Sequence, residues 1–229
     1  MLYSQQAVRD NIRNRDGKRI FYLGKGDQLT SDARDWLTRE RIEIVPADRA
    51  KVTSWKLPDG GHLTEKPEDM THLNGDTLVP KTHPRIIFRG KVDSLEAEML
   101  LCQLKLPRLQ PKLQELLTLT RNILQCEVLE KPLEEQPLCG LTEAEIRHRS
   151  HFPQKYYNQP HFMPEVTDGE TILHLNKLRT LVRETELAAN GALPHRQDIL
   201  KALNRLSSMV YILMIEEKAN AQFTMHTAQ

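Results

Sequence analysis

Four segments in the second half of the chain repeat apolar residues at three- and four-residue spacing, which is the pattern of amphipathic helices. The first, VDSLEAEMLLCQL, begins after Gly90, and the second begins at Pro111, a favoured first helical position. The third, ILHLNKLRTLVRETELAAN, ends at an Asn–Gly pair, and the fourth begins near Asp198. Four long helices with short to medium connections predict a helical bundle over residues 91–229.

Capping boxes and apolar stripes define these helices further. The TEAE sequence at Thr142–Glu145 predicts a short additional helix, and TDGE at Thr167–Glu170 predicts the start of the third long helix. The residues expected in the buried stripes are Leu113, Leu116, Leu117, Thr120 and Leu124 in the second long helix and Leu203, Leu206, Val210 and Leu213 in the fourth.

The first 60 residues have a different pattern. The runs IFYL at 20–23 and IEIV at 42–45 are rich in β-branched and aromatic residues, which predicts two strands. Between them, apolar residues at helical spacing follow Thr30, a candidate N-cap, and predict a helix. We therefore expect a small N-terminal α/β unit over residues 1–60 and a mainly α protein as a whole.

Residues 57–88 contain three glycines and four prolines, which predicts a long loop or linker. Long loops in a compact domain usually bind something. The predicted organisation is thus an α/β unit at 1–60, a loop at 61–90 and a bundle at 91–229.

Composition and charge narrow the class of protein. The 229 residues carry 32 basic and 31 acidic side chains, so bulk charge gives no reason to expect nucleic acid or a membrane surface as a partner. The longest apolar run, Met209–Ile215, is too short to span a bilayer, and the N-terminus lacks the apolar stretch of a secretory signal. Three widely spaced cysteines, Cys102, Cys126 and Cys139, predict free thiols in a cytoplasmic protein.

Common catalytic and nucleotide-binding motifs are missing from the sequence. LGKGD at 23–27 lacks the GxGxxG continuation, and there is neither a P-loop nor a GxSxG elbow. The histidines of RHRSH at 147–151 have no HExxH spacing and are expected at the surface. If a nucleotide such as ATP binds to this chain, residues outside these motifs must hold it.

Two helices carry polar residues that a simple bundle does not require. Arg179 and Arg183 share a helix face, and Glu186 lies on the same side. The planar guanidinium groups suit a phosphate, but a solvated face with an internal Arg–Glu pair explains the spacing equally well. On the very apolar fourth helix, Asn204 and Arg205 lie beside Ser207 and Ser208, which indicates either helix–helix hydrogen bonds or a polar ligand.

Taken together, these segments resemble a known family. LNKLRTLVRETE followed by DILKALNRLSSMVYILMI resembles the ethanolamine-utilisation cobalamin adenosyltransferases (EutT type), as do THLNGDTLVPKTHPRIIFRGKVDS at 71–94 and LTSDARDWLTRERIEI at 29–44. The two helical motifs are also similar to those of the broader PduO-type adenosyltransferases. The resemblance is collinear over nearly the whole chain.

The resemblance implies a fold and a reaction. The wider family forms helical bundles that assemble as homotrimers with active sites between subunits, which bind ATP with Mg²⁺ and a corrinoid. Co(I) of the reduced cobalamin attacks the 5′ carbon of ATP, and triphosphate leaves. For this chain the resemblance implies a cytoplasmic enzyme associated with a bacterial microcompartment, with a reductase or the ethanolamine ammonia-lyase machinery as partners.

The resemblance also implies roles for individual residues. Arg183 and Glu186 match the family's RxxE, in which the arginine holds the triphosphate and Glu186 would hold Mg²⁺, and Asn204 and Arg205 match its NRLS and would contact the nucleotide. Asp93 matches the aspartate of a VDEL-like helix start and would pair with Arg179 across a subunit boundary. The segment expected to form the nucleotide-binding loop contains Lys81, Thr82 and Arg85, without the glycine-rich form of the wider family.

The segment HFPQKYYNQPHFMPE at 151–165 is a candidate corrinoid lid, although a proline-rich surface connection packed by aromatics would have the same composition. The aromatic residues that would exclude water and the lower cobalt ligand are Phe152, Tyr156, Tyr157 and Phe162.

One departure from the family concerns metal. Many EutT-type proteins carry a histidine followed by a CCxxC cluster, whereas the matching stretch here, residues 51–70, has His62 but no cysteine. We therefore expect no structural zinc or iron site. The competing interpretation of the whole chain is a non-catalytic helical module that delivers a corrinoid or nucleotide to a partner enzyme.

Overall fold

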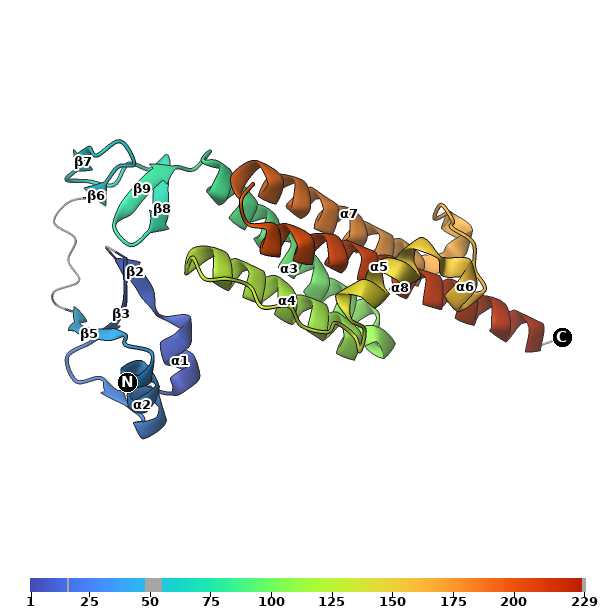
Figure 1. The fold of residues 1–229 in the computed structure, drawn as a ribbon, viewed down its shortest axis with the longest axis horizontal. Helices are drawn as coiled ribbons and strands as arrows, with labels where there is room; N and C mark the ends of the chain where they lie inside the picture. Colours follow the sequence, from blue (N-terminus) through green and yellow to red (C-terminus); the bar gives the residue numbers. More distant parts are fainter. Residues whose placement is uncertain (16, 48–54, 228–229) are drawn as a thin grey trace. The chain divides into compact units, whose positions relative to one another are not determined.

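The computed structural model describes residues 1–15, 17–47 and 55–227. The chain divides into two compact units, Met1–His83 and Pro84–Gln229 (Figure 1). Across the described ranges, no helix combines the length and apolar character that crossing a bilayer requires.

The N-terminal unit contains the predicted strand–helix–strand arrangement. β3 (Lys18–Leu23) and β5 (Glu43–Pro46) are parallel, and α2 (Ser31–Arg39) connects them. The Thr30 hydroxyl accepts a hydrogen bond from the Ala33 amide at 3.3 Å, which confirms the predicted N-cap. The remaining elements of this part are β1 (Leu2–Tyr3), α1 (Gln5–Asp10), β2 (Arg13–Arg15) and β4 (Gln28–Leu29).

The prediction of a loop over residues 57–88 is wrong. This stretch contains three short strands, which join β6 (Trp55–Lys56) in a sheet of order β7-β6-β9-β8. Gly75, at a φ of 51°, and Asp76 form the two-residue turn between β8 and β9, and glycine at the first turn position favours such a hairpin. Leu78 and Val79 of β9 are fully buried, and the burial of these two apolar side chains stabilises the strand. The strands are β7 (His62–Leu63), β8 (Met70–Asn74) and β9 (Thr77–Pro80).

The first long helix begins earlier than the sequence pattern predicts. α3 spans Pro84–Lys105, so Gly90 lies inside the helix instead of before it. Proline is favoured in a first helical turn, and Phe88, fully buried, extends the apolar stripe by one turn. The boundary between the compact units therefore falls at His83–Pro84, whereas the sequence placed the start of the bundle at residue 91.

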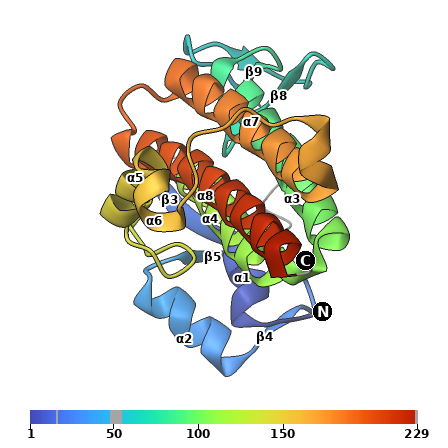
Figure 2. The ribbon, with the colours of Figure 1, turned by 90° about the vertical axis from the view of Figure 1, so that its right-hand side faces the viewer.

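The C-terminal unit is the predicted helical bundle. α3 and α7 (Gly169–Ala192) are antiparallel: Lys91 Nζ is 2.8 Å from Glu184 Oε2, and Lys177 Nζ is 2.7 Å from Glu98 Oε2. The sequence predicts that α7 ends at Asn190, but the helix continues to Ala192. A short connection then leads into α8, which begins at Gln197. Figure 2 shows the long helices of the bundle lying beside one another. The other two are α4 (Gln110–Val128) and α8 (Gln197–Thr227).

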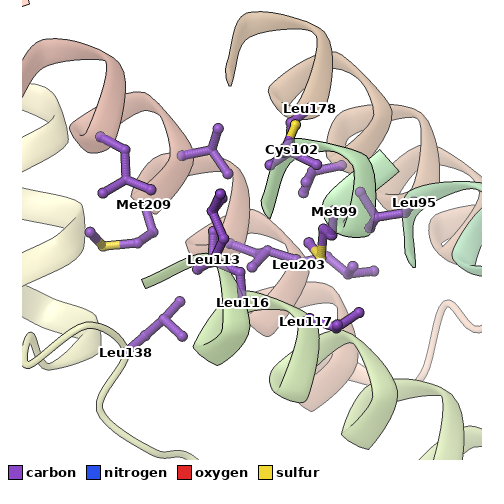
Figure 3. Packing of buried hydrophobic residues seen from close by; sticks show 14 of the residues in the cluster. Leu95, Met99, Cys102, Leu113, Leu116, Leu117, Leu138, Leu178, Leu203 and Met209 are labelled. Carbon is purple, nitrogen blue, oxygen red and sulfur yellow. The ribbon is translucent and has the colours of Figure 1, made fainter. Parts of the chain in front are cut away.

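All four long helices contribute to one hydrophobic core (Figure 3). The predicted stripes of α4 and α8 are buried, except that Leu124 is half-buried and Ile123 takes the buried position. The three cysteines are free, as predicted, and only Cys102 is buried. Burial raises the pKa of Cys102 to about 11, so this thiol remains protonated at neutral pH.

The connection from α4 to α7 carries two short helices, α5 (Glu143–His151) and α6 (Pro153–Tyr157). The capping box at Thr142–Glu145 is confirmed. The one predicted at Thr167–Glu170 is not formed, because Gly169 has a φ of 83° and interrupts the helical path. In its place, Asp168 accepts a hydrogen bond from the Glu165 amide in a 3-10 turn, Val166–Asp168.

Asp198 secures the start of α8. Its carboxylate accepts bonds from Arg196 at 2.8 and 3.0 Å and from the Leu133 amide at 2.8 Å, and the Arg196 bonds hold its pKa below the ordinary value of 3.8. A depressed pKa contributes stability above the unfolded-state pKa, and this stability is lost as the pH falls towards the folded-state pKa.

We expect Asp198→Asn to lower the free energy of unfolding by about 1.5–3 kcal/mol at pH 7, because charge-assisted bonds are lost. The measurement is urea denaturation of both proteins across the pH range. The difference in free energy of unfolding between the two proteins should be constant from about pH 5 to pH 8. It should be smaller near pH 3, where the Asp198 carboxyl of the unfolded natural chain is protonated. An equal difference at pH 3 would contradict this role.

Candidate active site

A cleft between α7 and α8 collects the polar residues that do not fit a simple bundle. It has a volume of about 410 Å³, within the usual range of ligand pockets. The two helices lie side by side in Figure 1, and the end of α5 closes one side. Residues lining the cleft include Arg179, Arg183, Glu186 and Asn190 from α7, Asn204, Ser207, Ser208 and Tyr211 from α8, and Ser150 and His151 from α5.

A hydrogen bond joins the two motif helices across the cleft. Asn204 Nδ2 donates to Glu186 Oε1 at 3.0 Å. Glu186 is half-buried, and among the described residues it forms no ion pair with Arg183. The alternative of an internal Arg–Glu pair on α7 is therefore not realised, and Glu186 instead meets Asn204, which is distant in the sequence.

The two arginines of the cleft form a pair of cations one helical turn apart. Burial lowers the pKa of Arg179, and the charge of Arg183 lowers it further. The Arg179 guanidinium lies 5.6 Å from the Tyr211 ring centroid, and its buried Nε has no hydrogen-bond partner. Arg183 is exposed and forms no ion pair within the described part of the chain. Two close cations without a carboxylate between them favour an anionic ligand.

Arg205 lies outside this cleft although it follows Asn204 in the sequence. Its side chain lines a second cavity on the other side of α8, with Glu143, Ile146 and Lys201. From there its Nη2 donates to Asn204 Oδ1 at 2.7 Å. Adjacent helical residues point about 100° apart, which explains why the two members of the NR pair face different cavities.

The structure holds Arg85 in a buried ion-pair cluster. Arg85 Nε and Nη2 donate to the carboxylate and the main-chain carbonyl of Glu127, and Nη1 lies 3.2 Å from Glu130 Oε1. Arg89 Nε donates to the second oxygen of Glu127 at 2.7 Å. Glu127 is fully buried, so the two arginines compensate its charge and join the start of α3 to the end of α4.

Three further predicted residues lie away from the cleft lining or in the other compact unit. Asp93 is exposed on α3, and its side chain has no hydrogen bond or ion pair among the described residues, Arg179 included. Lys81 and Thr82 are exposed residues at the end of the N-terminal unit, where the Lys81 amide donates to Asp69 O at 2.8 Å. Their roles stay predictions.

The aromatic segment 151–165 meets the cleft through Tyr211. Phe162 stacks near Tyr211 with ring centroids 6.1 Å apart, and His161 Nδ1 is 3.0 Å from the Tyr211 hydroxyl. Tyr157 is half-buried, whereas Phe152 and Tyr156 are 54% and 40% exposed. The four candidate lid residues therefore divide into two that pack on the bundle and two that face solvent.

Tyr211 and His161 are the site residues that sequence reasoning missed. Tyr211 lies seven residues after Asn204, two helical turns along the same face, so helical spacing alone would have identified it. His161 has no comparable signal, because its position depends on the path of an irregular segment.

The described residues contain no cluster of three or more His, Cys, Asp or Glu side chains arranged to hold a metal ion. Residues 51–54, part of the stretch that aligns with the family's cysteine cluster, lie outside the described residues. Glu186 presents a carboxylate next to the two cations, a donor type that suits Mg²⁺ bound together with a polyphosphate.

The structure shows a helical bundle with a cleft lined by two arginines, and sequence comparison specifies the family. The model of the cobalamin adenosyltransferase family matches residues 62–217, which is more than half of the chain. The chain belongs to the cobalamin adenosyltransferase family.

Individual relatives agree with this assignment. The chain is 39% identical to the corrinoid adenosyltransferase EutT of Salmonella typhimurium over 174 residues, covering 73% of this chain and 65% of the relative. It is 38% identical to EutT of Escherichia coli K12 over 160 residues, covering 67% and 60%. The chain thus spans less than two thirds of the length of these relatives. No solved structure matches the chain.

Proposed function

We propose that this chain transfers the 5′-deoxyadenosyl group of ATP to the Co(I) centre of a reduced corrinoid and makes adenosylcobalamin for ethanolamine utilisation. Membership of the family and the similarity to EutT support the reaction class. The observation that carries the proposal is the single cleft in which Arg179, Arg183, Glu186 and Asn204 meet.

The proposed reaction needs few reactive groups from the protein. Co(I) is a strong nucleophile: the cobalt–carbon bond forms as the bond between C5′ and the triphosphate oxygen breaks, and the electron pair leaves with triphosphate. The chain must orient the two substrates and stabilise the departing charge. Arg183, exposed in the cleft, and Arg179, one turn away, are placed for the second task.

The remaining polar residues of the cleft would orient the nucleotide. Asn204 offers the amide hydrogen that Glu186 does not use. Magnesium bound with ATP would screen the triphosphate, and Glu186 would hold it directly or through water. Lys81 and Thr82 are proposed as further contacts to ATP, supplied by the segment before α3.

The segment 151–165 is proposed as the corrinoid lid. Support comes from Phe162, which stacks on Tyr211 at the edge of the cleft, and from half-buried Tyr157. Exposed Phe152 and Tyr156 supply apolar surface for a large flat ligand. Closure of these rings over the cobalt face would exclude water and the lower ligand.

The decisive experiment is anaerobic incubation of the protein with ATP, Mg²⁺ and chemically reduced cobalamin, followed by visible spectroscopy. The expected result is the spectrum of a cobalt–carbon product. Absence of product between about pH 6 and pH 9 would overturn the proposed activity. Tight binding of corrinoid without product would instead favour a carrier module.

We expect catalysis to require Mg²⁺ and no structural transition metal. EDTA should abolish activity and Mg²⁺ alone should restore it, because the stretch that aligns with the family's metal motif has His62 but no cysteine, and a tight zinc or iron site typically uses thiolates. Elemental analysis of the purified protein is the measurement. Stoichiometric zinc or iron, with activity lost on its removal, would contradict this prediction.

A homotrimer with sites between subunits is also proposed, because Asp93 is exposed and unpaired within the described chain while Arg179 has a buried, unpartnered Nε. Asp93→Arg should lower activity, and combination with Arg179→Asp should restore part of it if the two pair across subunits. Sedimentation provides the oligomeric state, and a fully active monomer would exclude this arrangement.

The cellular setting follows from the same resemblance. We propose a cytoplasmic location in association with a bacterial microcompartment, with a reductase or the ethanolamine ammonia-lyase machinery as partners. Co-purification with microcompartment shells from cells grown on ethanolamine would test this association.

A further inference from the structure

Arg205 contacts Glu143 and Asn204, and its own side chain lines a cavity other than the nucleotide cleft. Its Nε lies at the ion-pair distance of 3.7 Å from Glu143 Oε1 at the start of α5 but forms no hydrogen bond among the described residues, whereas its Nη2 donates to Asn204 Oδ1 at 2.7 Å. The side chain is only 15% exposed and lines the cavity of about 200 Å³ between α8, α5 and the connection after α4. A group held in this way is poorly placed to touch ATP directly.

The two partners of Asn204 fix the orientation of its amide. Arg205 can only donate hydrogen bonds and an ionised carboxylate can only accept them. The Asn204 oxygen therefore faces Arg205, and its nitrogen faces Glu186 at 3.0 Å. Rotation of the amide by half a turn would place a donor against a donor and an acceptor against an acceptor. Arg205 thus determines which atoms Asn204 presents in the cleft.

Glu143 in turn anchors Arg205. It is the first residue of α5, and the Thr142–Glu145 capping box fixes that start. A hydrogen bond from Lys201 lowers the pKa of Glu143, so the carboxylate is charged at neutral pH. Contacts therefore run without a break from Glu143 through Arg205 and Asn204 to Glu186, from one side of α8 to the other.

We propose that Arg205 is a positioning residue that orients the Asn204 amide for the nucleotide, with Glu143 as its anchor. This inference rests on the proposed function, because it takes the cleft to be the ATP site. It replaces direct contact between Arg205 and nucleotide with an indirect role, and it makes the start of α5 part of the machinery that selects ATP.

A double-mutant cycle separates the indirect role from direct contact. Arg205→Met is made in the natural chain and in Asn204→Ala, and KM for ATP and kcat are measured beside the Kd of a non-reactive ATP analogue. In the natural chain we expect KM and Kd to rise about tenfold, the effect of losing one charge-assisted bond, while kcat changes less than about threefold. In Asn204→Ala we expect Arg205→Met to have no further effect, because the residue through which it acts is gone.

Equal losses in the two backgrounds would show that Arg205 touches the nucleotide itself and would overturn the proposal. Glu143→Gln should raise KM for ATP by about threefold, in the natural background only. If Arg205→Met does not fold, Glu143→Gln is compared in the natural chain and in Asn204→Ala instead. The proposal would be overturned if Glu143→Gln left KM for ATP unchanged in the natural chain, or raised it equally in both backgrounds.

Lys112→Met is the matched control. Lys112 pairs with Glu216 of α8 at 2.7 Å and, among the described residues, has no contact with Glu143, Arg205 or Asn204. Its KM for ATP should stay within about twofold of the natural value, and a tenfold rise would indicate a general disturbance of α8 and count against the relay. Failure of the natural chain to adenosylate cobalamin would refute the proposed function. The Kd of the non-reactive ATP analogue would still test whether Arg205 acts through Asn204.

Discussion

Arg183→Ala should slow adenosyl transfer by about 10²–10³-fold, the usual cost of losing one donor that stabilises charge in the transition state. Arg183 is exposed in the cleft and forms no ion pair within the described part of the chain, so nothing in the fold depends on it. The measurement is the initial rate of product formation at saturating ATP, together with a thermal melt that should be nearly unchanged.

Two comparisons make this result interpretable. Arg183→Lys keeps the charge but loses the two-pronged geometry and should recover only part of the rate. Arg121→Ala removes an arginine that pairs with Glu96 on the outer surface of the bundle, and it should leave the rate unchanged. An Arg183→Ala variant with at least half the natural rate would remove this residue from the mechanism.

Glu127→Leu should lower the free energy of unfolding by about 3–5 kcal/mol, because it leaves two guanidinium groups without their buried partner. Glu127 is fully buried, and the Arg85 and Arg89 side chains are each only 17% exposed. Chemical denaturation followed by circular dichroism measures the change.

The matched control is Glu130→Gln. Glu130 pairs with Arg85 at 3.2 Å but is 54% exposed, so its replacement should cost less than about 1 kcal/mol. Replacement of Arg85, Arg89 and Glu127 together by leucine should recover much of the loss, because no uncompensated charge then remains. A Glu127→Leu variant as stable as the natural chain would show that water or rearrangement relieves the two arginines.

Periodicity predicted the bundle well and the segment before it poorly. The four long helices and the parallel β3–α2–β5 unit follow from apolar spacing that continues over several turns or a whole strand. Residues 57–88 contain strands of only two to five residues, too short for a clear alternation, and glycine and proline dominated the interpretation. The Gly75–Asp76 turn was the informative signal there.

The candidate site was predicted as a set of residues, but not as a set of contacts. Helical spacing predicted that Arg179, Arg183 and Glu186 share one face, and the family resemblance implied a nucleotide contact for Asn204, which lines the same cleft. The family resemblance implied that Arg205 contacts the nucleotide together with Asn204, whereas the side chain of Arg205 lines another cavity. Arg85 was expected to contact the nucleotide, whereas the structure pairs it with Glu127, an acidic residue on the buried stripe of α4 two turns after Thr120.

The short connection between α7 and α8 has a consequence for how the cleft comes into being. The three charged residues of its lining, Arg179, Arg183 and Glu186, and the amide of Asn204 lie within a single antiparallel helical hairpin. Closing so short a loop costs little chain entropy, and contacts that are near in sequence form quickly. We therefore expect the hairpin to assemble the cleft's charged groups early in folding, before α3 and α4 complete the core against which it rests.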